Sequence, residues 1–113
     1  MINTLYRTGY IGKVELKNRL VMGPAGFGFC DEDKGAVNDR MIEFFHQRAR
    51  GGVGLIDVGA VQIDADHYTD HDMVKIYSDE FIDGFKRLAD AVHAEGAKIM
   101  GCLLYTSPSP RDR

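Results

Sequence analysis

The chain has 113 residues, which is enough for one small domain. Its content of 44% hydrophobic and 27% charged residues is typical of a folded globular chain and argues against global disorder. A net charge of −3 without a visible basic face argues against nucleic-acid binding. The apolar stretches are far shorter than the roughly 20 residues that span a bilayer, and the N-terminus lacks a signal-peptide core. We therefore expect a cytoplasmic protein with neither nucleic-acid nor membrane partners.

The first predicted elements are a hairpin and a short strand. The segment YIGKVELKN, residues 10–18, places apolar residues on both sides of a turn at Gly12–Lys13, which is consistent with a hairpin. The compact apolar run at 19–23 predicts a buried strand, which cannot extend through Pro24. A long glycine-rich loop, residues 24–38, follows.

A helix and a second strand come next. Asn38 or Asp39 can cap the helix. Its apolar residues recur at helical spacing on one face: Met41, Ile42, Phe45 and Ala49. Gly51 and Gly52 end the helix, because glycine suits the left-handed position after a helix C-terminus. The apolar run at 53–58 predicts the second strand.

A second helix and a third strand complete the pattern. A long loop is expected from Gly59 to about Tyr77, and Ser78 is a suitable N-cap for the helix after it. That helix has a wide apolar stripe: Phe81, Ile82, Phe85, Leu88, Ala89 and Val92. Gly96 terminates it, and residues 97–101 begin a third strand.

Strand and helix thus alternate, which predicts a parallel sheet with crossover helices. The loops after helices are one or two residues long, whereas the loops after strands, 24–38 and 59–77, are long. Long loops without secondary structure are uncommon unless they have a function. In parallel α/β folds ligands bind at the carboxyl ends of the strands, so we expect the functional face there.

Small residues follow both of the first two strands. Pro24, Ala25 and Gly26 follow the first, and Gly59 and Ala60 follow the second. Their small side chains leave room for a flat ring to approach the strand ends. The same residues are also common in tight loop entries, so the pattern leaves both interpretations open.

Other motifs give weaker indications of chemistry. The glycines at 23, 26 and 28 do not follow the dinucleotide-binding order, and the next helix starts too late to cradle a pyrophosphate. The stretch DADHYTDHD, residues 64–72, fails as a calcium loop and lacks the helical pattern of a zinc site, so we expect a solvated loop and no metal. Cys30 precedes three acidic residues that disfavour a thiolate, which argues against a reactive nucleophile.

Three phrases, in matching order and spacing, resemble the old yellow enzyme family of NADH:flavin oxidoreductases. They are IGKVELKNRLVMGP at 11–24, RARGGVGLI at 48–56 and AVHAEGAK at 91–98. The resemblance covers roughly residues 5–101. It implies the N-terminal part of an FMN-containing (β/α)8 TIM barrel, truncated after a hairpin, about three strands and two helices.

The resemblance also implies chemistry. Such enzymes use FMN, with NADH or NADPH as hydride donor, to reduce activated C=C bonds of unsaturated carbonyl, enoate or enoyl-CoA compounds. By position, Pro24, Ala25, Gly26 and Ala60 match residues that line the flavin. The expected catalytic residues lie beyond the chain, so none is assigned here and we expect the fragment to be inactive alone. An iron–sulfur cluster in the missing C-terminal region is compatible with the resemblance.

There are departures from the family pattern. The family often has Met or Leu at the position of Ala25 and Thr or Cys at that of Gly26, and it continues Q-L-x-H-x-GR where this chain has CLLYTSP. Two rivals stay open: another flavin barrel of the dihydroorotate dehydrogenase type, and a non-catalytic α/β module.

The end of the chain differs from the rest. Residues 102–112, CLLYTSPSPRD, resemble the conceptual translation of a transposon-end sequencing adapter. We therefore expect residues 1–101 to be a partial FMN-binding TIM-barrel domain and residues 102–113 to be a non-native or disordered tail.

Overall fold

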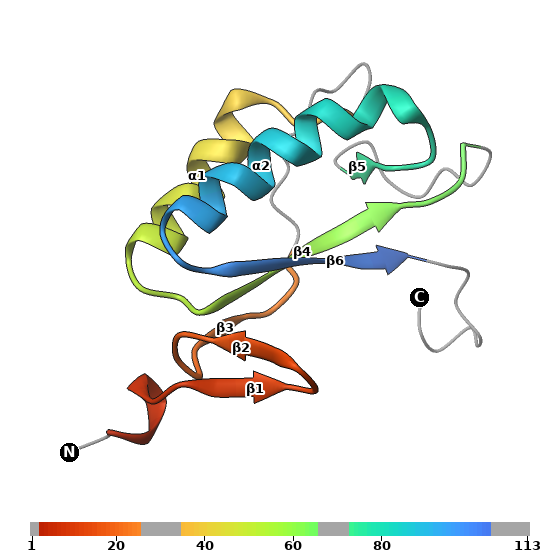
Figure 1. Ribbon diagram of the computed structural model, residues 1–113. Helices are drawn as coiled ribbons and strands as arrows, with labels where there is room; N and C mark the ends of the chain where they lie inside the picture. Colours follow the sequence, from red (N-terminus) through yellow and green to blue (C-terminus); the bar gives the residue numbers. More distant parts are fainter. Residues whose placement is uncertain (1–2, 26–34, 66–72, 105–113) are drawn as a thin grey trace.

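A parallel sheet with two helices on one of its faces forms the centre of the molecule, and a hairpin lies at the amino ends of the strands (Figure 1). The computed structural model describes residues 3–25, 35–65 and 73–104. The hairpin region contains η1 (Thr4–Tyr6), β1 (Gly9–Ile11) and β2 (Val14–Leu16). The remaining elements are β3 (Val21–Met22), α1 (Asp39–Arg50), β4 (Leu55–Gln62), β5 (Val74–Lys75), η2 (Asp79–Phe81), α2 (Ile82–Ala94) and β6 (Lys98–Leu104).

β4 is the central strand of the sheet. β6 pairs with it in parallel along its whole length, from Leu55↔Lys98 to Gln62↔Leu104. The other edge of β4 is shared by β3 at its start and β5 at its end, both also parallel. The predicted parallel sheet with crossover helices is thus confirmed. Among the described helices, none is long and apolar enough to cross a membrane.

The predicted hairpin is also confirmed. β1 and β2 pair antiparallel, and Ile11↔Val14 is the last pair before a two-residue turn. Gly12 in that turn has φ +58°, a left-handed conformation that glycine adopts without steric cost. Lys17, which follows β2, donates from Nζ to the carbonyl of Glu95 at 2.8 Å, so the hairpin is tied to the C-terminal end of α2.

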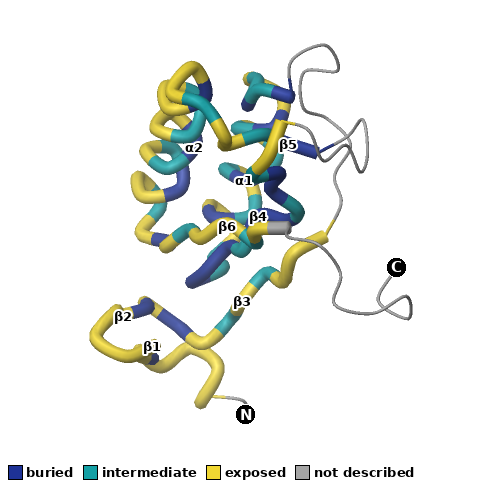
Figure 2. Tube along the Cα trace, turned by 90° about the vertical axis from the view of Figure 1, so that its right-hand side faces the viewer, coloured by how far each residue is buried: buried dark blue, intermediate teal, exposed yellow. Residues whose placement is uncertain are grey.

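The first helix follows its prediction closely. The side chain of Asn38 accepts a hydrogen bond from the backbone N–H of Met41 at 2.9 Å, which satisfies one of the free donors at the helix start. Met41, Phe45 and Ala49 are buried against the sheet, and Figure 2 shows the buried faces of both helices directed toward the strands.

The second helix begins later than predicted. Ser78 makes no side-chain capping bond, a 3₁₀ turn intervenes, and α2 starts only at Ile82. Packing explains the difference, because Phe81 is buried and its ring meets that of Tyr77 edge-on, with centroids 5.2 Å apart. The stripe itself is confirmed in part, since Phe81, Leu88 and Val92 are buried while Ile82 is exposed.

Two of the predicted strands need correction. The first strand is shorter than 19–23 and is not buried, since Val21 is 54% exposed. β4 runs four residues past the predicted end at 58, because Val61 is fully buried and paired with both neighbours. A third strand beginning within 97–101 is confirmed, and it starts at Lys98 and runs to Leu104. Residues 105–113 lie outside the described residues.

Asn18 joins the start of the sheet to the turn after α1. Its Nδ2 donates to the carbonyl of Gly52 at 2.6 Å, and its Oδ1 accepts from the backbone N–H of Leu20 at 3.1 Å. Gly54 lies directly against it, so a Cβ at position 54 would overlap both the side chain and the backbone of Asn18. The asparagine of the LKNR phrase and the last glycine of the GGVG phrase are therefore parts of one contact.

We expect Asn18→Asp to lower the free energy of unfolding by about 2 kcal/mol, because the carboxylate can still accept from Leu20 but cannot donate to the part-buried carbonyl of Gly52. Urea unfolding followed by circular dichroism measures the change. Asn3→Asp is the matched control, since Asn3 is exposed and its side chain makes no capping bond. Equal losses of stability in the two variants would contradict the role given to Asn18.

Candidate functional site

The carboxyl end of β4 is distorted by a β-bulge. Gly59 pairs with Cys102 and Val61 with Leu103, so Ala60 is an extra residue without a partner on β6. Before the bulge, side chains alternate in the usual way, with Ile56 and Val58 buried beneath the helices. The same alternation places Gly59, which follows Val58, on the opposite face of the sheet, and the bulge at Ala60 returns Val61 to the core.

Pro24 lies directly over Gly59 on that opposite face. A Cβ built on Gly59 would overlap the Cβ of Pro24, so no larger residue fits at position 59 in this arrangement. Pro24 and Ala25 are both exposed at the end of β3. Pro24, Ala25, Gly59 and Ala60 thus form a rim of small or compact side chains at the ends of β3 and β4.

Of the four residues predicted to bind a cofactor, three have a described position. Pro24 and Ala25 follow β3, and Ala60 is the half-buried bulge residue of β4, next to the glycine that Pro24 contacts. Gly26 lies outside the described residues. Ala60 was expected in a loop after the strand, but it lies within the strand.

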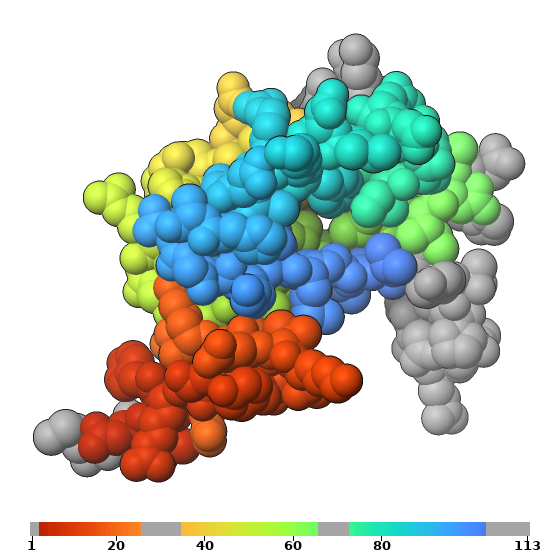
Figure 3. Space-filling view, in the orientation of Figure 1, coloured from red at the N-terminus to blue at the C-terminus, as the bar shows by residue number. Residues whose placement is uncertain are grey.

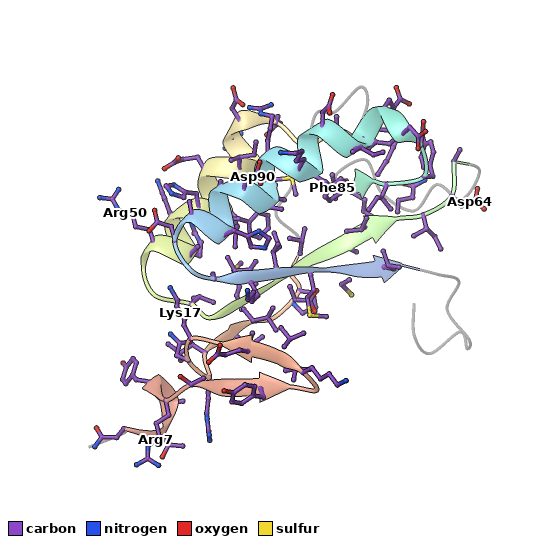
Figure 4. All side chains as sticks on the ribbon, in the orientation of Figure 1. Arg7, Lys17, Arg50, Asp64, Phe85 and Asp90 are labelled. Carbon is purple, nitrogen blue, oxygen red and sulfur yellow. The ribbon has the colours of Figure 1, made fainter. Side chains whose placement is uncertain are left out.

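Sequence reasoning missed two polar residues of β4. Within the described residues, Asp57 Oδ1 and Gln62 Oε1 are buried and have no hydrogen-bond partner. Gln62 is only 4% exposed, and its Nε2 donates to the carbonyl of Asp64 at 2.6 Å. Figure 4 shows Asp64 beyond the carboxyl end of β4, at the opposite end of the sheet from Lys17. The sequence did contain a signal for them, because Asp57 and Gln62 are polar residues within an otherwise apolar strand.

β6 brings one further residue to this face. Cys102 pairs in register with Gly59, so the two residues share the face on which Pro24 lies. The thiol is half-buried and free. It stands where the family pattern Q-L-x-H-x-GR has its glutamine, so a thiol, which is a weaker hydrogen-bonding group, replaces an amide there.

The other chemical candidates lie elsewhere or outside the described residues. Cys30, His67 and His71 are not described. Among the described residues, no group of three or more His, Cys, Asp or Glu side chains could hold a metal ion. His46 is held on the far side of the molecule from this rim, with Nε2 2.9 Å from Glu95 Oε1 at the C-terminal end of α2.

The sequence as a whole identifies the family. Residues 5–109, nearly the entire chain, match the family described as the NADH:flavin oxidoreductase / NADH oxidase family. The chain belongs to this family. The match extends eight residues beyond position 101, where the resemblance recognised in the sequence ended.

Known proteins of this family support the same conclusion. A metal reductase of Desulforamulus reducens is 44% identical over 102 residues, which cover 90% of this chain and 15% of that protein. A 2-naphthoyl-CoA reductase, solved as a complex with 2-naphthoyl-CoA, superimposes with a TM-score of 0.88 at 31% identity, over 95% of this chain and 16% of that one. The old yellow enzyme of Pichia sp. AKU4542 superimposes with a TM-score of 0.83 at 28% identity, over 92% of this chain and 27% of the enzyme.

The chain therefore spans about one-sixth of the first two relatives and about one-quarter of the third. The mixed α/β fold and these superpositions confirm the predicted fold class, a part of a (β/α)8 barrel. In this architecture the rim of Pro24, Gly59 and Ala60 lies at the carboxyl ends of the barrel strands, where TIM-barrel enzymes carry their active sites.

We expect Gly59→Ala to lower the free energy of unfolding by about 1–3 kcal/mol, because the new methyl group overlaps Pro24 and forces β3 away from β4. Gly101→Ala on the neighbouring strand is the matched control. A Cβ there meets only Val61 Cγ2 at 3.6 Å, an ordinary contact, so its effect should stay within about 0.5 kcal/mol. Urea unfolding of both variants tests the close approach, and equal stability of the two would contradict it.

Proposed function

We propose that this chain forms part of the flavin site of an FMN-dependent NAD(P)H oxidoreductase that reduces activated carbon–carbon double bonds. The observation that carries the proposal is the contact between Pro24 and Gly59 beside the bulge at Ala60. Around this contact the ends of the two adjacent parallel strands carry only the compact residues Pro24, Ala25, Gly59 and Ala60. A planar ring can lie against such a rim.

The polar atoms near the rim suit the same ligand. Gln62 provides a buried acceptor oxygen without a partner among the described residues, and an isoalloxazine carries an N–H group that such an oxygen can accept from. Pro24 and Ala25 are exposed, and their side chains are apolar and carry no hydrogen-bonding group. When bound, FMN supplies hydride transfer from NADH or NADPH to the β-carbon of an activated alkene.

The substrate class is also a proposal. The 2-naphthoyl-CoA reductase superimposes on nearly all of this chain and carries an aromatic acyl-CoA in its structure. An unsaturated carbonyl compound, enoate or enoyl-CoA is the corresponding class for this protein. The protein's small residues at the rim position the ring, while the residues expected to bind the substrate carbonyl and donate a proton lie on later barrel strands.

We expect the 113-residue chain alone to catalyse no reduction of 2-cyclohexenone or cinnamate with NADH and added FMN. The reason is that one rim of strand ends orients neither substrate nor proton donor, and both are required for the reaction. Loss of NADH absorbance under anaerobic conditions measures the rate. Free FMN without protein is the control, and turnover above that background would contradict the expectation.

A chimaera tests the proposed function itself. Residues 5–104 replace the matched segment of the Pichia old yellow enzyme, and we expect the purified chimaera to retain FMN and to reduce 2-cyclohexenone with NADPH. Gln62→Leu in the chimaera should weaken FMN binding about tenfold, because a buried hydrogen-bond acceptor is lost. Gln47→Leu, on the exposed face of α1, is the control and should leave FMN affinity unchanged. A folded chimaera that binds no FMN would refute the proposal.

A further inference from the structure

The face of the sheet opposite the helices carries an aspartate on β4 and a lysine on β6. The neighbours of Asp57 and Lys98 along their strands all pack into the core beneath the helices: Ile56, Val58, Ala97 and Ile99. Because successive side chains of a strand point to opposite faces, Asp57 and Lys98 both point away from the helices. In a closed barrel this face is the interior, and we call it the inner face.

Lys98 lies within reach of Asp57. Met100 is the register partner of Asp57 on β6, and Lys98 is the inward-facing residue just before Met100. With about 3.3 Å per residue along a strand and about 4.8 Å between strands, the Cα atoms of Asp57 and Lys98 are about 8 Å apart. A lysine and an aspartate side chain together span this separation.

The other cations close to the sheet are held elsewhere. Within the described strands of the sheet the charged residues are Asp57, Lys75 and Lys98. Lys75 lies on β5, five residues further along the ladder than Asp57, and its side chain packs directly against Gly35. The side chain of Arg19 packs against a glycine of the hairpin. Lys98 is therefore the cation that the register brings to Asp57.

Asp57 occupies a place where a carboxylate needs a partner. Its Oδ1 is buried and has no hydrogen-bond partner among the described residues. Leu55, the inward-facing residue before it, is only 6% exposed although it is not part of the core beneath the helices. Figure 3 shows the hairpin packed beneath β4 and β6, at the end of the sheet where Leu55 lies. An unpaired charge in such a place is costly, and an opposite charge with good geometry offsets much of that cost.

We propose that Asp57 and Lys98 form an ion pair inside the barrel, in the layer beneath the rim, and that this pair sets the electrostatic environment of the bound flavin. The inference rests on the proposed function. Gly59 of the rim is the next inward-facing residue after Asp57, about 7 Å along β4. Unit charges about 10 Å apart, at an effective dielectric constant of about 20, interact strongly enough to change an equilibrium about tenfold.

The two charges act on a flavin at the rim in opposite directions. Reduction adds negative charge to the ring system, which a carboxylate beneath the rim disfavours and an ammonium group favours. When the two groups are paired, their effects largely cancel. The pair therefore satisfies both groups and leaves the reduction potential close to that of neutral surroundings, whereas the loss of either group leaves the other uncompensated.

The reduction potential of FMN bound to the chimaera, measured against a reference dye, tests the proposal. We expect Asp57→Asn to raise the potential and Lys98→Met to lower it. Each should change the ratio of reduced to oxidised FMN about tenfold at a fixed potential, which corresponds to about 30 mV for a two-electron couple. The double variant D57N/K98M should return the potential to the parent value. Lys86→Met and Asp90→Asn, in the exposed ion pair on α2, are matched controls and should leave it unchanged.

Urea unfolding of the FMN-free chimaera tests the ion pair without the flavin. Either single variant leaves one charge unpaired in the interior, so each should be less stable than the double variant D57N/K98M. The same cycle on Lys86 and Asp90 should give almost no coupling, because that pair is exposed. A chimaera that folds without FMN would therefore count against the proposed function, while its unfolding would still decide whether the ion pair exists.

Three outcomes would overturn the inference. Potential shifts of the same sign in the two single variants would contradict opposite charges beneath the rim. Single variants that are as stable as the double variant would show that the two groups do not interact. An effect of Asp57→Asn without any effect of Lys98→Met would place the partner of Asp57 on another strand.

Discussion

The contact between Asn18 and the turn after α1 is the constraint on which the arrangement of the sheet depends. The amide of Asn18 donates to Gly52 and accepts from Leu20, and the carbonyl of Leu20 in turn accepts from the N–H groups of Gly54 and Leu55. These bonds fix where β4 begins relative to β3. Since register is set at the start of a parallel pair, the same contact determines which residues of the two strands meet at their far ends.

The candidate site follows from that register. Val21 pairs with Leu55 and Met22 with Ile56, so the chain leaves β3 at the level where Pro24 reaches Gly59. A slip of one residue would bring Pro24 against a side chain instead of a glycine and would move every buried residue of β4 to the wrong face. The interaction at the amino ends of the strands therefore positions the rim at their carboxyl ends, although no catalytic chemistry takes place near Asn18.

Local sequence patterns correctly predicted the features that depend on contacts between residues close together in the chain. The cap at Asn38 and the apolar spacing of α1 are short-range features, and both were confirmed. The end of β4 was missed because Gly59 and Ala60 are typical of a loop entry. The strand continues past them because Val61 and Gln62 pair with both β5 and β6. The exposure of Val21 and the contact between Asn18 and Gly54 depend on residues far apart in the chain, so no local pattern could reveal them.

The face of the sheet opposite the helices explains why this part of a barrel is a poor unit on its own. Val21, Asp57 and Met100 share that face, where the first and last are about half exposed and Asp57 Oδ1 is buried without a partner among the described residues. An unsatisfied buried acceptor costs about 1–3 kcal/mol, and exposed apolar side chains forgo about 25 cal/mol for each Å² left in water. In a closed barrel this face is the interior, and the remaining strands would cover it. The same sequence that forms a well-packed helix layer thus carries an inner face whose apolar and polar groups are suited to burial by further barrel strands.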